Sequence, residues 1–175
     1  MDERELAQRA KQGDLEAFSG LVRIHQAGVY NVAYRMLGEC REAEDAAQET
    51  FLRAYRAFRT FDPQRPPGPW LKKIAVNVCL NRLERREPLT LADETAIPAP
   101  DPGPESQTVQ REQNNQVRAA MLSLPPHYRA AIELRHFQEL SYADMAEALN
   151  RPLSDIKSDL FRARKMLAEI LKASL

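Results

Sequence analysis

The chain of 175 residues is poor in cysteine and glycine and carries no net charge. Its two cysteines, Cys40 and Cys79, cannot form a disulfide framework and lack the spacing of metal ligands. Basic and acidic residues number 25 each, which argues against a strongly basic protein that binds nucleic acid by itself. The apolar runs are too short to cross a bilayer, and the charged N-terminus is unlike a secretory signal. We therefore expect a reduced, cytoplasmic protein without metal, cofactor or membrane insertion.

What the sequence contains instead is helical periodicity. Apolar residues recur at spacings of three and four, and no run shows the alternation of a β-strand. Over 88–110 there are five prolines and four acidic residues but no Lys or Arg, whereas the stretches on either side each carry a net charge of +2. The pattern predicts an all-α fold with two small domains of four helices each. They cover 1–87 and 113–175, and a flexible, acidic, proline-rich linker (88–112) joins them.

Caps and apolar stripes predict the four helices of the first domain. The first helix ends before Gly13, and the second runs from an N-cap at Asp14 to Gly38. The fourth opens with Pro69 in its first turn, a position where proline is tolerated. The third helix spans about 41–58, and its apolar residues predict a core face formed by Ala47, Phe51, Ala54, Tyr55 and Phe58.

The second domain contains a candidate helix-turn-helix. Ser141 is placed to cap an eight-residue helix, and a short turn ending near Pro152 precedes a last long helix that Ser154 is expected to cap. In such a motif the second helix enters the DNA major groove. The alternative is a surface helix in an ordinary bundle. The side chains expected to face the DNA are Lys157, Ser158, Phe161, Arg162 and Lys165.

Two polar stripes on the first domain are further candidate surfaces. Lys73, Asn77, Asn81 and Arg85 are each four residues apart with Trp70 at their start, which suits a splayed single strand, or simply a solvated helix face. Asp45, Gln48, Glu49 and Leu52 form an acidic stripe that suits a basic partner, or again a solvated face. No nucleophile, histidine or metal spacing accompanies these carboxylates, so we do not expect an enzyme such as a nuclease.

These pieces, in this order, resemble a bacterial RNA polymerase sigma factor of the extracytoplasmic-function (ECF) group. The resemblance covers nearly the whole chain. Each motif is modestly specific alone, and the ordered set across a proline-rich segment is very specific. The residues that carry it are Glu44–Tyr55, Trp70–Asn77, Leu124–Arg129, Leu140–Ala146, Lys157–Ser158 and Leu160–Arg164.

The resemblance implies a division of labour between the domains. The first would dock on the β′ clamp of core RNA polymerase and capture the −10 promoter element, and the second would sit on the β flap and read the −35 element as duplex. It also implies an anti-sigma factor as a partner of a chain that is monomeric when free. The implied polymerase-binding residues are Asp45, Gln48, Glu49, Phe51 and Leu52. The implied −10 residues are Arg65, Trp70, Lys73, Asn77, Asn81, Arg82 and Arg85, and the implied −35 residues are Ser154, Asp155, Lys157, Ser158, Phe161, Arg162, Arg164 and Lys165.

The sequence departs from the family pattern at several points. Asp155 and Asp159 place two carboxylates at the end of the helix that would enter the groove, where they would repel phosphates. Asp155 can support the helix N-terminus, whereas Asp159 is expected to accept a hydrogen bond from a cytosine or to weaken −35 binding. The loop 62–69 is proline-rich, which leaves the base captured at −10 open, and Asn81 stands where many members carry Asp.

Two questions remain open at the level of sequence. A stand-alone helix-turn-helix regulator is the alternative function, although it leaves both polar stripes of the first domain unexplained. The arrangement of the free domains is also open, since the acidic linker could fold them together through their basic faces. That folding would protect Arg85 and Arg162 from solvent.

Overall fold

The computed structural model describes residues 2–86 and 108–173, and every regular element among them is helical. This confirms the all-α prediction and its two groups of four helices. Residues 88–107 of the predicted linker lie outside the described residues, and no described helix is long and apolar enough to cross a membrane. The elements are α1 (Glu3–Lys11), α2 (Leu15–Leu37), α3 (Cys40–Ala57), η1 (Phe58–Thr60), α4 (Pro67–Arg85), α5 (Thr108–Leu122), α6 (Pro126–Ile132), η4 (Glu133–Phe137), α7 (Tyr142–Leu149) and α8 (Leu153–Ala173).

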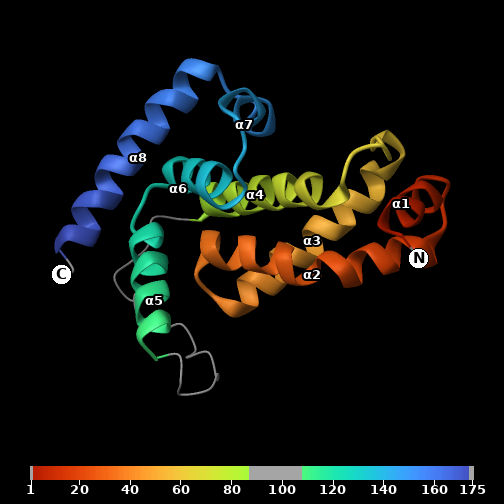
Figure 1. The fold of residues 1–175 in the computed structure, drawn as a ribbon, viewed down its shortest axis with the longest axis horizontal. Coiled ribbons are helices and arrows are strands. Elements are labelled where there is room, and N and C mark those ends of the chain that lie inside the picture. Colours follow the sequence, from red (N-terminus) through yellow and green to blue (C-terminus); the bar gives the residue numbers. More distant parts are fainter. Residues whose placement is uncertain (1, 87–107, 174–175) are drawn as a thin grey trace.

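The N-terminal domain is a bundle of α1 to α4 around the long helix α2 (Figure 1). Helix α2, with buried Leu21, Val32 and Met36, packs against α4, which buries Leu71 and other apolar residues. Burial raises the pKa of the Cys79 thiol to about 12, so this cysteine behaves as a small apolar side chain.

Local signals at the helix ends are mostly where the sequence places them. The Asp14 carboxylate accepts from the backbone N–H of Ala17 at 3.1 Å, and Gly38 ends α2 with φ +80°, a conformation that favours glycine. The fourth helix, however, begins at Pro67, two residues before the predicted Pro69. Pro67 occupies the first helical position, where its missing N–H costs no hydrogen bond.

The predicted core face of α3 is partly wrong. Tyr55 is 48% exposed, and the buried residues of α3 are Ala43, Ala46, Thr50 and Ala54. Small side chains let α3 lie close to its neighbours, and the Thr50 hydroxyl donates to the Ala46 carbonyl at 2.7 Å, so it is satisfied inside the bundle. Hydrophobicity alone favours the bulky residues, but the close packing of the helices selects the small ones.

The C-terminal domain packs α5, α6 and α7 against α8. Helix α5 begins at Thr108, inside the stretch 88–112 that was predicted as linker. Helix α6 continues into the π-helical turn η4, and Ser141 caps α7 as predicted, because its hydroxyl accepts from the N–H of Asp144 at 3.1 Å. Ser154 does not cap α8. The helix begins at Leu153, so Ser154 lies inside its first turn.

The two domains pack together, with α6 alongside α4 and α5 against the end of α2 (Figure 1). Arg35 of α2 makes a two-pronged ion pair with Glu133 of η4, with both N–O distances 2.7 Å, and its guanidinium lies over the Phe137 ring at 4.4 Å. Glu133 is fully buried. Arg85 and Arg162 are both exposed, so the domains do not meet through these basic residues.

Arg129 of α6 ties the ends of two helices, α5 and α2, to α6. Its guanidinium donates to the carbonyls of Met121, Leu122 and Leu124 around the end of α5, and to the carbonyl of Met36 near the end of α2. Burial lowers the pKa of Arg129 to about 10, which leaves it charged at neutral pH. A cation at helix C-termini satisfies carbonyls that have no partner within the helix.

Substituting Gly38 tests the contact between the domains. A Cβ on Gly38 would lie 2.8 Å from the side chain of Leu122 of α5, whereas a Cβ on Gly13, which also has positive φ, would meet nothing within 4 Å. We expect Gly38→Ala to lower the free energy of unfolding by about 1–2 kcal/mol through backbone strain, and by more than Gly13→Ala. Thermal and urea unfolding of both variants measure the difference. Equal losses would show that the Leu122 contact adds nothing.

Candidate nucleic-acid and partner interfaces

Helix α8, the predicted recognition helix, has an outer face that carries several exposed basic side chains. Lys157, Ser158, Arg162 and Lys165 are exposed, and Phe161 is 70% exposed. The opposite face is anchored by buried Ile156, Leu160 and Ala163. Arg164 is exposed too, and its Nε donates to the His136 ring at 3.1 Å. This arrangement presents cations and one aromatic ring on a rigid helix.

The two acidic residues of α8 have different environments. Asp159 is 8% exposed, and its carboxylate is ion-paired with Arg151 of the turn before α8. Asp155 is half-buried in the first turn of the helix, with one oxygen 3.7 Å from the same guanidinium. In this structure Asp159 therefore does not lie on the exposed face of α8. Burial and pairing with Arg151 hold its carboxylate against the helix-turn-helix.

On α4, the polar stripe is only partly free. Lys73 and Asn81 are half-buried and Arg85 is exposed. The side-chain amide of Asn77 donates to the carbonyl of Ala148 of α7 at 2.8 Å, and more weakly to that of Lys73 at 3.2 Å. The C-terminal domain thus occupies the hydrogen-bonding group of one predicted −10 residue.

The start of α4 combines an aromatic cluster with an exposed loop. The Trp70 ring packs against Phe61 and Phe58, with centroids 4.8 and 5.6 Å away, and Trp70 is half-buried. Arg65 of the loop is exposed, and its Nε lies 3.9 Å from the Asp62 carboxylate. Trp70 therefore contributes to the core as well as to the surface.

The acidic stripe of α3 separates into exposed and internally paired residues. Asp45 and Gln48 are exposed and Leu52 is 58% exposed, whereas Phe51 is half-buried against the core. Glu49 accepts from Arg53 at 2.8 Å through one oxygen and from Arg82 at 2.9 Å through the other. Partial burial alone would raise the pKa of Glu49, but these hydrogen bonds outweigh it and hold the pKa below its ordinary value.

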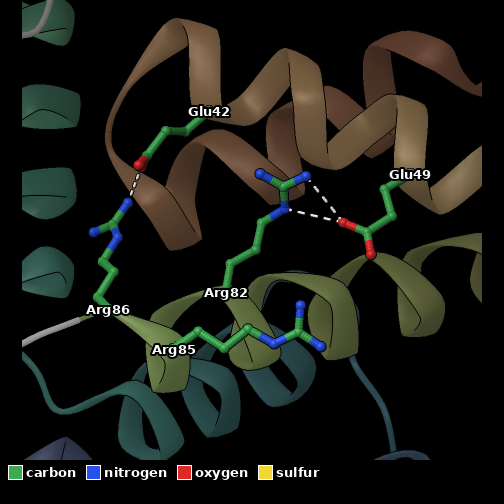
Figure 2. Close-up of a pocket in the computed structure, with 5 residues that line it drawn as sticks. All are labelled: Glu42, Glu49, Arg82, Arg85 and Arg86. Atoms are coloured by element: carbon green, nitrogen blue, oxygen red, sulfur yellow. Dashed lines mark hydrogen bonds and ion pairs between the residues drawn. The ribbon is translucent and has the colours of Figure 1, made fainter.

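Glu49 of α3 and Arg82 of α4 form an ion pair within a hollow that is lined by charged side chains. Figure 2 shows Arg82 pointing across it to Glu49, Arg86 reaching Glu42, and Arg85 lying beside them without a drawn partner. A predicted polymerase contact and a predicted −10 contact are therefore partners of each other. Within 2–86 and 108–173, no group of three or more His, Cys, Asp or Glu side chains could hold a metal ion.

Sequence reasoning missed the charged residues that have structural partners far along the chain. Glu133 stands between Ile132 and Leu134 in an apolar run, and Arg35 stands between Tyr34 and Met36 in the last turn of α2. A lone charge inside an apolar stripe is a signal for a buried pair, because a buried charge without a partner is very costly. The sequence does not say which two charges meet, since 98 residues separate Arg35 from Glu133.

Family models and relatives of known sequence match most of the chain. Residues 21–88 match the family model "Sigma-70 region 2" and residues 114–167 match "Sigma-70, region 4". The chain is 35% identical over 175 residues to the ECF RNA polymerase sigma factor SigW of Bacillus subtilis, covering 94% of both chains. It is 32% identical over 184 residues to the RNA polymerase sigma-H factor of Pseudomonas aeruginosa, covering 99% of this chain and 95% of that one.

Two solved structures share the fold. The structure of CnrH in complex with the cytosolic domain of CnrY has a TM-score of 0.69 at 24% identity and covers 99% of both chains. The sigma factor RpoE in complex with the anti-sigma factor NepR, from Bartonella quintana, has a TM-score of 0.64 at 22% identity and covers 90% of this chain and 98% of that one. Helices, family models and relatives define an RNA polymerase sigma factor that directs promoter-specific transcription. The chain belongs to the extracytoplasmic-function group of that family.

Proposed function

We propose that this sigma factor reads the −35 element as duplex through α8 and captures the opened −10 element through α4 and the loop before it. The observation that carries the proposal is the exposed face of α8, where Lys157, Arg162 and Lys165 surround Phe161 on the second helix of a helix-turn-helix. Lysine and arginine bind phosphates and guanine edges, and a helix of this kind fits the major groove. The proposed domains are region 2 (1–87) and region 4 (113–175), and the proposed linker (88–112) overlaps the first residues of α5, which begins at Thr108.

The −10 surface combines cations with groups that bind bases. Arg65 and Arg85 are exposed cations, and Asn81 supplies an amide on the same stripe as Lys73. The half-buried Trp70 ring lies at one end of the stripe, where an unstacked base could contact its free edge. Arg82 contributes to this surface indirectly, because its guanidinium is ion-paired with Glu49 of α3.

Core RNA polymerase is the proposed partner of the exposed part of α3. Asp45 and Gln48 flank the exposed apolar side chain of Leu52, which supplies an apolar anchor inside a polar rim. We assign this face to the β′ clamp and the C-terminal domain to the β flap. An anti-sigma factor is a second proposed partner, of the kind named in the RpoE–NepR complex.

Promoter binding on these terms requires the packed domains to separate. Asn77 contacts Ala148 at 2.8 Å, and the chain from Ala148 to Phe161 reaches at most about 47 Å even when fully extended. The −10 and −35 elements are about 25 base pairs apart, roughly 85 Å along straight duplex. The packed arrangement therefore cannot place Asn77 and Phe161 on both elements at once. The chain from Arg86 to Thr108 permits the separation, because it can reach about 75 Å when extended.

The test is abortive transcription from a library of randomised promoters, with core polymerase in the presence and absence of the full chain. We expect initiation only when the protein is added, with defined sequences selected at both elements. Polymerase binding without promoter selection would contradict the assigned DNA surfaces. A protein that does not bind polymerase would leave the stand-alone helix-turn-helix regulator as the better account.

The free protein is expected to bind promoter duplex weakly. Its net charge is zero, so the protein as a whole has no long-range attraction to DNA, and polymerase supplies most of the non-specific contact with DNA. A gel shift at physiological salt should show no specific complex below about 1 μM protein. A tight, sequence-specific complex without polymerase would contradict this expectation and favour the stand-alone regulator.

A further inference from the structure

The turn before α8 holds an ion-pair cluster that faces the recognition helix and includes Asp155 as its one predicted −35 residue. Arg151 stands in this turn, after Asn150, which has the left-handed φ of 51° that ends α7. Asp155 and Asp159 are one helical turn apart on the same side of α8, where two like charges repel. The Arg151 guanidinium lies between them, paired with Asp159 through Nη1 and 3.7 Å from Asp155 through Nη2.

Burial distinguishes the members of this cluster from the exposed face of α8. The Asp159 side chain is 11% exposed and that of Arg151 is 27% exposed, whereas Phe161, two residues beyond Asp159, is 70% exposed. The Asp159 carboxylate thus points toward the turn and the core. Among the described residues, Arg151 is the cation that is ion-paired with Asp159.

We propose that Arg151 is the positioning residue of −35 recognition: it withdraws the Asp159 carboxylate from the DNA side of α8 and ties the turn to the helix. This inference rests on the proposed reading of duplex DNA by α8. It assigns no base contact to Asp159 and none to Arg151. The reading residues are then Lys157, Ser158 and Arg162, whose side chains remain exposed while Arg151 and Asp159 neutralise each other.

On this proposal, the effect of losing Arg151 on −35 recognition depends on whether Asp159 is present. Without Arg151, the Asp159 carboxylate loses its partner and turns toward water, beside the phosphates that α8 approaches. A like charge at this place weakens binding. Without Asp159, Arg151 has one fewer acidic partner, and no carboxylate is released toward DNA. Removing Arg151 should therefore be harmful only while Asp159 is present.

The experiment is transcription by the full chain with core polymerase from promoters whose −35 element is randomised. We expect Arg151→Ala to lose about tenfold or more of −35-dependent initiation. Asp159→Asn should stay within about twofold of the parent and select the same −35 bases. The double variant Arg151→Ala/Asp159→Asn should recover most of the loss, and Arg151→Lys should retain most of the activity because it keeps the charge. Glu169→Gln, an exposed carboxylate on α8, is the matched control and should change nothing.

Each other outcome overturns a specific statement. A changed base preference in Asp159→Asn would show that Asp159 reads a base. A double variant as weak as Arg151→Ala would show that Arg151 itself contacts DNA or serves only the fold. Polymerase binding and thermal unfolding of each variant separate these two cases, and the base preference of Asp159→Asn decides the point even where Arg151→Ala does not fold. A parent protein that selects no −35 sequence would instead refute the proposed function.

Discussion

Replacing Arg35 by alanine is expected to separate the two domains of the free protein. The change leaves the Glu133 carboxylate fully buried, and among the described residues only the Gln138 side-chain amide, at 3.3 Å, still donates to it. Removing one partner of a buried ion pair costs about 3–5 kcal/mol. Opening the domain interface lets water reach the carboxylate and avoids that cost. The described part of the interface also holds the polar contacts of Asn77 with Ala148, of Arg129 with the Met36 carbonyl, and of His127 with Glu84 at 3.1 Å.

Small-angle X-ray scattering measures this directly. A packed chain of this length has a radius of gyration of roughly 16 Å, and separated domains give a value larger by several ångströms. We expect the increase in Arg35→Ala, and its reversal in the exchanged pair Arg35→Glu/Glu133→Arg. Neither residue lies on a proposed DNA or polymerase surface, so transcription should persist in the separated form.

Arg53→Ala is the matched control for Arg35→Ala. Arg53 is also paired with a glutamate, Glu49, but within the N-terminal domain and at 40% side-chain exposure. Its loss should leave the scattering unchanged. If Arg35→Ala scatters as the parent does while its melting temperature falls, the pair stabilises the fold and does not control domain separation.

The second large effect is expected at Leu52. Its side chain is 58% exposed beside Asp45 and Gln48 and contributes little to the core. An apolar anchor at the centre of an interface is worth about 2 kcal/mol or more. Leu52→Asp should therefore weaken binding to core polymerase by about 30-fold. Stability should change by less than about 0.5 kcal/mol, because the site is on the surface.

Competition for core polymerase against the parent protein, together with a melting curve, measures both quantities. Ile24→Asp is the control, since Ile24 is 51% exposed and belongs to α2 and not to the α3 stripe. It should compete as well as the parent. Equal competition by Leu52→Asp would remove this face of α3 from the proposed polymerase interface. A Glu49 variant is a poorer test, because losing Glu49 also releases Arg82 and Arg53.

Much of the architecture follows from short-range sequence signals. The caps at Asp14, Gly38 and Ser141 depend on one side chain and the backbone within a few residues, so they can be read directly. The exposed face of α8 follows in the same way from its apolar spacing. Errors at Pro69 and Ser154 are shifts of one or two residues at helix ends, where several residues could serve as the first position.

The wrong or missing assignments concern residues whose partners are chosen by packing. Tyr55 was expected in the core, but the closeness of the helices favours Ala and Thr there. Asp159 was expected to face DNA, but Arg151 holds it against the turn. In both cases composition and spacing allow two faces, and the neighbouring element decides between them.

By itself, then, the sequence determined the helical class, the two-domain division and the family, because periodicity, caps and ordered motifs are local properties of the chain. Only the tertiary structure decided which charged and polar side chains are paired within the fold and which remain available to bind a partner. It paired Arg35 with Glu133, Glu49 with Arg82, and Asn77 with the carbonyl of Ala148. The physical reason is that desolvated polar groups must find partners, and those partners can come from any part of the chain that folding brings within about 3 Å.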